Sequence, residues 1–308
     1  MDAIFAITIF VFGLAFGSFL NVCIYRLPRG LPISLPKSKC PSCGNAIRPY
    51  DNIPVLSWLI LRGRCRRCRA RISPRYMVVE LLSGLLFVAC YAEFGLTPLA
   101  LKFTVFSYLL LGLIFTDAET QLLPDKLTLP GFALGLVFSL IVPINDLVQQ
   151  YIGLRVTLPF SFEVAWRLTS LADALLGAAV GASFIFAAGT LYMRARGIEG
   201  MGFGDVKLMA MIGAFLGTRL TIFTLLAASL FGSLVGLGAI LIVWMRRTRR
   251  RMERANEPAS VARQKAWRSA QTMYRRYPIP FGVFLGAMAI FAAFFGNSTV
   301  SWYVETFW

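Results

Sequence analysis

Four cysteines have the spacing of a metal site. They form two C-x2-C pairs, CPSC at 40–43 and CRRC at 65–68, separated by 21 residues. Two such turns that face each other build a tetrahedral thiolate cage matched to Zn2+. Two disulfides, or an iron centre with four thiolate ligands, are the alternatives. The spacing favours a closed structural zinc site whose ligands are Cys40, Cys43, Cys65 and Cys68.

Two aspartates could do acid–base chemistry. Asp117 ends one apolar run in LIFTDAETQLLPD, and Asp205 opens another in EGMGFGDVKLM, where Gly200, Gly202 and Gly204 permit a tight turn. Two carboxylates within about 3 Å share one proton, so one can take a proton from water while the other donates to a peptide carbonyl. Either aspartate alone would be read as a helix cap or an interfacial residue. Together they predict the catalytic pair of an aspartyl peptidase.

The composition leaves few other chemistries. The 308 residues include no histidine, which excludes Ser-His-Asp and Cys-His catalysis and any His-ligated metal. Apolar side chains make up 57% of the chain, which is too much for one water-soluble core. We expect an all-α polytopic membrane protein with about eight transmembrane helices. The apolar runs lie at about 3–25, 77–95, 98–116, 127–145, 171–193, 206–218, 220–245 and 279–297.

The basic residues predict the orientation of these helices. With the N-terminus outside, 27 of the 31 Lys and Arg residues fall in segments on the cytoplasmic side. These segments are 26–75, 117–126, 194–207 and 246–278. Asp117 and Asp205 then lie at the cytoplasmic ends of their helices, at the same depth, where they can meet.

The chain divides into three parts on this basis. Residues 1–25 are expected to form the first transmembrane helix, 26–75 a small zinc-stapled cytoplasmic insert, and 76–308 the membrane peptidase domain. The basic stretch 246–278 is expected to be a cytoplasmic loop that lies on anionic lipid, and no nucleic acid is expected. Glu80, near the cytoplasmic end of the second span, could pair with Arg75 or line a cavity.

These motifs resemble those of the type IV prepilin peptidases, the leader peptidase/N-methyltransferases of type IV pilus and type II secretion systems. The similarity runs almost end to end. GSFLNVCIYRLP at 17–28, the tetracysteine region, TDAETQLLPD at 116–125, GMGFGDVKLMAMIGAFLG at 200–217 and IPFGVFLG at 279–286 resemble the family's motifs. One departure is Val283, which stands where the family usually has Pro.

The resemblance implies an eight-span protease of the bacterial inner membrane with Asp117 and Asp205 as its catalytic pair. It implies that the substrates are type IV prepilins or pseudopilins, whose short leader is removed on the cytoplasmic side. It further implies that the new N-terminal residue is methylated from S-adenosylmethionine. No fingerprint for this methyl donor is visible in the residues, so the sequence assigns no cofactor-binding residue.

Two other classes of function compete with this interpretation. A proton-coupled transporter would also use intramembrane carboxylates. It does not explain why two of them occupy the same ends of their helices beside Gly-rich turns. A membrane-tethered nucleic-acid binder would use the cysteines and the basic stretch, yet neither shows the aromatic and basic interleaving of a stacking platform.

Overall fold

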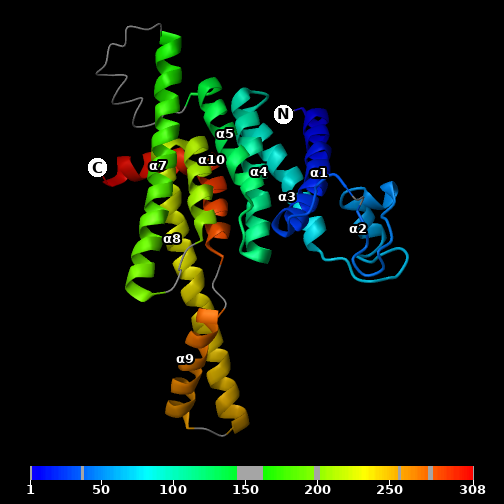
Figure 1. Ribbon diagram of the computed structural model, residues 1–308, viewed down its shortest axis with the longest axis vertical. Coiled ribbons are helices and arrows are strands. Elements are labelled where there is room, and N and C mark those ends of the chain that lie inside the picture. The colour runs from blue at the N-terminus through cyan, green and yellow to red at the C-terminus, as the bar shows by residue number, and fades with distance from the viewer. Residues whose placement is uncertain are drawn as a thin grey trace.

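The protein is mostly helical over the residues described by the computed structural model, which are 2–35, 38–143, 162–197, 202–255, 258–276 and 280–307. Figure 1 shows a bundle of long helices with a small unit beside α1 and a helical arm below. The described residues contain no strand beyond two isolated bridges, both in the small unit. The expected all-α fold is therefore confirmed for this part of the chain.

The long helices of the bundle follow the apolar runs of the sequence. Their bounds are α1 (Ala3–Arg26), α3 (Arg75–Phe94), α4 (Pro98–Thr120), α5 (Asp125–Ile141), α7 (Phe162–Arg196), α8 (Phe203–Ala255) and α10 (Phe281–Phe307). The small unit contains α2 (Leu56–Ile60), and the arm contains α9 (Ala259–Arg276).

Six of these helices are long and apolar enough to cross a membrane, within the described residues. The count differs from the expected eight for two reasons. The run at 127–145 forms α5, which has only 17 residues. The runs at 206–218 and 220–245 are both in α8, which is interrupted at Gly217, where φ is 77° and ψ is −179°. Each of the eight runs contributes a helical segment within the described residues, so eight is an approximate count of these segments.

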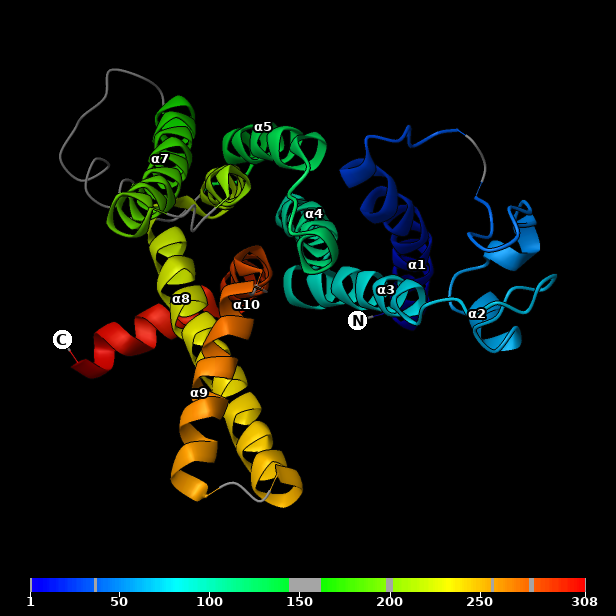
Figure 2. The same ribbon diagram turned by 60° about the horizontal axis from the view of Figure 1, so that its bottom comes forward.

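Helix α4, which carries Asp117, is the most enclosed of the candidate spans. In the most apolar 18-residue stretch of α4, 61% is buried, against 33% or less in the same stretch of the other five helices. Figure 2 shows α4 between α3 and α5, with α10 close by. Phe106 of α4 stacks on Phe215 of α8, with ring centroids 4.7 Å apart. The bundle therefore holds Asp117 on a helix that neighbours surround.

Helices α7 and α8 approach each other through glycines. A Cβ added to Gly213 would lie 2.3 Å from backbone atoms of Gly177 and Ala178, so no larger residue fits without moving a helix. Small residues at a helix interface let two backbones touch, which is a common way to join membrane helices. This close packing fixes the first half of α8, at whose start Asp205 lies.

Asp173 of α7 stabilises the interruption of α8. Its Oδ1 accepts a hydrogen bond of 2.7 Å from the Thr218 hydroxyl and another of 3.4 Å from the Thr218 N–H. Because Gly217 breaks the helix, Thr218 begins a second helical segment whose first N–H groups need acceptors. Asp173 is a cap, but it caps α8 rather than its own helix.

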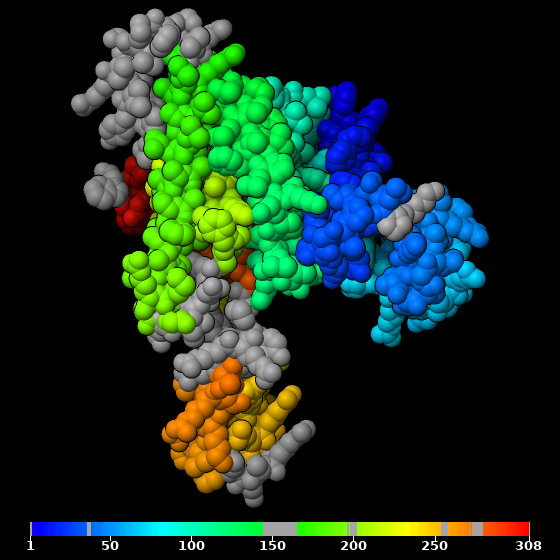
Figure 3. All heavy atoms as spheres, in the orientation of Figure 1, coloured from blue at the N-terminus to red at the C-terminus, as the bar shows by residue number. Residues whose placement is uncertain are grey.

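The basic stretch 246–278, expected to be a loop, is helical over its described residues. The end of α8 and α9 form an antiparallel hairpin that projects from the bundle (Figures 1 and 3). Trp244 packs edge-on against Trp267, and Trp244 Nε1 donates to the Arg263 carbonyl at 3.1 Å. Three buried alanines of α9 share a spacing of four and so lie on one face of the helix. They are Ala262, Ala266 and Ala270.

Candidate active site and thiolate cluster

Asp117 lies in the last turn of α4, where the first turn of α10 meets it. Its side chain is almost fully buried, and its Oδ2 accepts a hydrogen bond of 3.1 Å from the Val283 N–H. The first N–H groups of a helix have no partner inside that helix and carry partial positive charge. The start of α10 therefore stabilises a negative charge on Asp117.

Asp205 lies in the first turn of α8 and is also buried. Its N–H donates to the Gly202 carbonyl at 3.1 Å, so the glycine-rich segment turns directly into the helix. A Cβ on Gly204 would lie 3.0 Å from Leu123 Cβ, which shows how closely the start of α8 packs on the segment after α4. Gly200 lies outside the described residues.

The two aspartates meet at Gly282 of α10. A Cβ added to Gly282 would lie 2.8 Å from Asp117 Oδ2 and 3.4 Å from Asp205 Oδ1. The two carboxylate oxygens are therefore at most about 6 Å apart, which is close enough for a water to lie between them. The structure thus brings together the two acids that the sequence singled out. It also adds Gly282, whose missing side chain leaves room for both carboxylates.

Two ion pairs border the acids. Lys207 Nζ lies 2.6 Å from Asp125 Oδ1 and joins α8 to α5 just beyond Asp205. Arg75 pairs with Glu119, two residues after Asp117, and so joins the start of α3 to the end of α4. Exposed pairs contribute little to stability. The two pairs join the helices that carry the acids, α4 and α8, to α3 and α5.

Glu80 does not pair with Arg75. Its Oε2 instead accepts a hydrogen bond of 2.7 Å from the N–H of Val55, in the small unit. Val55 has φ at 60°, which is rare for a β-branched residue and indicates local strain. Through this hydrogen bond, Glu80 links α3 to the small unit that contains the cysteines.

The four cysteines gather in that small unit. Their sulfur atoms all lie within 4.8 Å of one another, and the Sγ atoms of Cys40 and Cys68 are 3.8 Å apart. A tetrahedral zinc with bonds of about 2.3 Å requires sulfur atoms about 3.8 Å apart. The donor set and its spacing therefore fit a four-coordinate metal ion.

The two cysteine turns have the same hydrogen bonds. The Cys40 N–H donates to the Asn45 carbonyl at 2.9 Å, and the Cys65 N–H donates to the Ala70 carbonyl at 2.9 Å. Each turn ends on a residue with positive φ, which is Gly44 in the first and Arg69 in the second. The Cys43 N–H, the largest of several causes, lowers the pKa of the Cys40 thiol to about 7, whereas burial and the neighbouring thiols raise the pKa of Cys68 to about 11, so Cys40 ionises more readily than Cys68.

Two family models match the chain. Residues 11–94 match the bacterial peptidase A24 N-terminal domain, and residues 104–237 match the type IV leader peptidase family. A prepilin leader peptidase/N-methyltransferase of Aeromonas hydrophila is 33% identical over 97% of this chain and 93% of its own. The chain belongs to the type IV leader peptidase family.

Other relatives of this family member carry the same name. The prepilin leader peptidase/N-methyltransferase of Burkholderia pseudomallei strain K96243 is 35% identical over 96% of this chain and 86% of its own. That of Pseudomonas putida is 39% identical over 73% of this chain and 78% of its own. No solved structure matches. The family expected from the motifs is confirmed, with the cysteines in the first matched region and both aspartates in the second.

Proposed function

We propose that this leader peptidase family member removes the leader of type IV prepilins or pseudopilins and then methylates the new N-terminal residue. The observation that carries the peptidase proposal is the meeting of two buried carboxylates at Gly282. The names of the relatives support the substrate and the second reaction. The proposed location is the bacterial inner membrane, with the acids and the cysteines toward the cytoplasm, as the basic residues favour.

Asp117 and Asp205 act as one unit in the proposed reaction. The ionised carboxylate takes a proton from a water as its oxygen attacks the scissile peptide carbonyl. The protonated carboxylate donates a hydrogen bond to the carbonyl oxygen, where negative charge develops. When the carbon–nitrogen bond breaks, the leaving amine takes up a proton from the pair, and one proton again lies between the carboxylates.

The thiolate cluster has a structural role in this proposal. Four sulfur ligands close the coordination sphere of a Zn2+ ion, so no position is open for substrate. The ion would join the two cysteine turns of a unit that has almost no buried apolar residues of its own. Zinc is proposed over iron because it is the usual metal of closed four-cysteine sites.

The methyl donor is S-adenosylmethionine in this proposal, but the cavity near the cysteines does not fit it. That cavity has a volume of about 460 Å³ and is lined by Trp58 together with Arg62, Arg64 and Arg71. S-adenosylmethionine carries a net positive charge, which three guanidinium groups repel. The methyl-transfer proposal therefore rests on the relatives and assigns no residue to the donor.

One experiment tests both reactions. The purified protein is incubated with a prepilin and S-adenosylmethionine, and the product mass is read. We expect a mature product that is one methyl group heavier than the cleaved chain. Asp117→Asn or Asp205→Asn should each abolish cleavage while the protein still inserts, and the matched control Glu253→Gln, at an exposed ion pair near the end of α8, should cleave normally. Near-normal cleavage by either of the first two variants would overturn the assignment.

A further inference from the structure

The tetracysteine insert, residues 26–75, presents apolar side chains although it is strongly basic. It holds 12 Lys and Arg residues. Around α2, however, four large apolar residues are 46–66% exposed. These residues, the α2 apolar face, are Ile53, Leu56, Leu59 and Ile60. A patch of this kind on a polar unit marks a contact with another apolar phase.

The insert folds back along the membrane helices. Val55, which directly precedes α2, donates to Glu80 Oε2, and Glu80 lies five residues inside α3. At 1.5 Å per residue, this contact lies about 7 Å along α3 from its start. On the other side, a Cβ on Gly17 of α1 would lie 2.7 Å from Glu80 Cα, and α1 continues from there to Arg26. The start of α2 is therefore level with residues inside two apolar spans.

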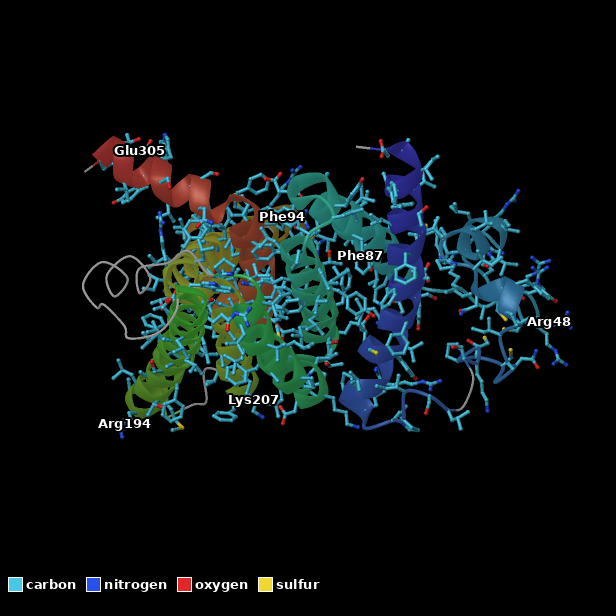
Figure 4. All side chains as sticks on the ribbon, turned by 90° about the horizontal axis from the view of Figure 1, so that it is seen from above. Arg48, Phe87, Phe94, Arg194, Lys207 and Glu305 are labelled. Atoms are coloured by element: carbon cyan, nitrogen blue, oxygen red, sulfur yellow. The ribbon has the colours of Figure 1, made fainter. Side chains whose placement is uncertain are left out.

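The polar edge of the bundle lies at the start of α3. Arg75, its first residue, pairs with Glu119 near the end of α4. Val55 and the α2 apolar face lie beyond this edge, level with the apolar part of α3. The distance of about 7 Å matches the depth at which amphipathic segments rest between headgroups and acyl chains. Figure 4 shows the insert beside α1 at the outside of the bundle, with Arg48 on its outer side.

Arginines of the insert lie near the start of α3, on the Trp58 side of α2. Arg62, Arg64 and Arg71 line the cavity beside Trp58, together with Ser73 and Pro74, which directly precede α3. Guanidinium groups bind phosphate through paired hydrogen bonds, and basic residues beside a membrane attract anionic lipids. Exposed apolar side chains at this level, in a unit whose arginines lie near the polar start of α3, match a phospholipid in both chemistry and position.

We propose that the α2 apolar face is embedded in the bilayer leaflet on its side of the membrane and that the arginines of the cavity contact lipid phosphates. The tetracysteine insert is thus a membrane-seated unit. Glu80 fixes its depth through the hydrogen bond to Val55. The occupant of the apolar face is phospholipid rather than a second copy of this chain, because the face is exposed at the level of the apolar spans, where the surrounding phase is lipid.

The test measures which quencher reaches this face. A fluorescent amino acid replaces Leu59 in the full-length protein, which is placed in vesicles of phosphatidylethanolamine and phosphatidylglycerol. Spin-labelled lipids report contact with acyl chains, and iodide reports contact with water. The matched control carries the same amino acid at Gln264, an exposed position of α9 on the arm that projects away from the bundle (Figure 1). Ile60 is a second test position in case the first variant does not fold, and metal content reports folding.

We expect the label at position 59 or 60 to be quenched several-fold more by lipid labelled near the headgroup than the label at position 264. Iodide should quench position 264 several-fold more. Equal quenching by iodide at all three positions would overturn the proposal. A label at 59 and 60 that neither quencher reaches would also overturn it, because a protein partner would then cover the face.

Discussion

Gly282→Ala tests whether the space at Gly282 holds the acids in place. The added Cβ would lie 2.8 Å from Asp117 Oδ2, whereas ordinary contacts begin at 3.4 Å, so the carboxylate must move by about 0.6 Å. Catalytic groups must be held within about 0.5 Å, and a displacement of about 1 Å costs about 100-fold in rate. We therefore expect kcat to fall about 10- to 100-fold, with little change in KM.

The thermal stability of Gly282→Ala should not fall along with its kcat. Alanine favours a helix over glycine by about 1 kcal/mol, so thermal unfolding should occur at an equal or higher temperature. The assay is the steady-state cleavage of a prepilin, with unfolding followed in the same detergent. Gly238→Ala is the matched control, because its added Cβ meets nothing within 4 Å and its kcat should not change. A kcat of Gly282→Ala within twofold of the parent would refute the geometry.

Three further outcomes follow from the structure. The double variant Cys40→Ala, Cys65→Ala should lose its bound metal, measured by elemental analysis, and full metal content would contradict the cluster. Gly213→Val should prevent α7 and α8 from packing and abolish the folded protein in a detergent stability assay, because its Cβ would lie 2.3 Å from backbone. Asp173→Ala removes the cap of Thr218 and should lower stability by about 1–2 kcal/mol, measured by reversible unfolding, while an unchanged stability would refute the cap.

The helices could be predicted from the sequence, but the interruption of α8 could not. Apolar runs of span length must be helical in a bilayer, since lipid offers no partner for the backbone. The interruption at Gly217 depends on Asp173, which lies 44 residues earlier in the chain and supplies the cap from another helix. The hairpin of α8 and α9 had a signal in Ala262, Ala266 and Ala270, because a spacing of four places small residues on one helix face.

The acid pair could be found from its motifs, and its surroundings could not. Asp117 and Asp205 stand out because acids are rare in apolar runs. Gly282 and the Val283 N–H enter the site from a helix that begins more than 70 residues after Asp205, so only the fold shows them. The sequence could not identify the partner of Glu80 either, because that partner is the backbone N–H of Val55, in another unit.

The most direct test of the central claim compares cleavage by Asp117→Asn, Asp205→Asn and the variant that carries both changes. If the two carboxylates act as one unit on one water, each single variant should lose about 100- to 10,000-fold in rate, and the double variant should be no slower than either. Losses that multiply in the double variant, or a single variant that cleaves at a near-normal rate, would contradict the account.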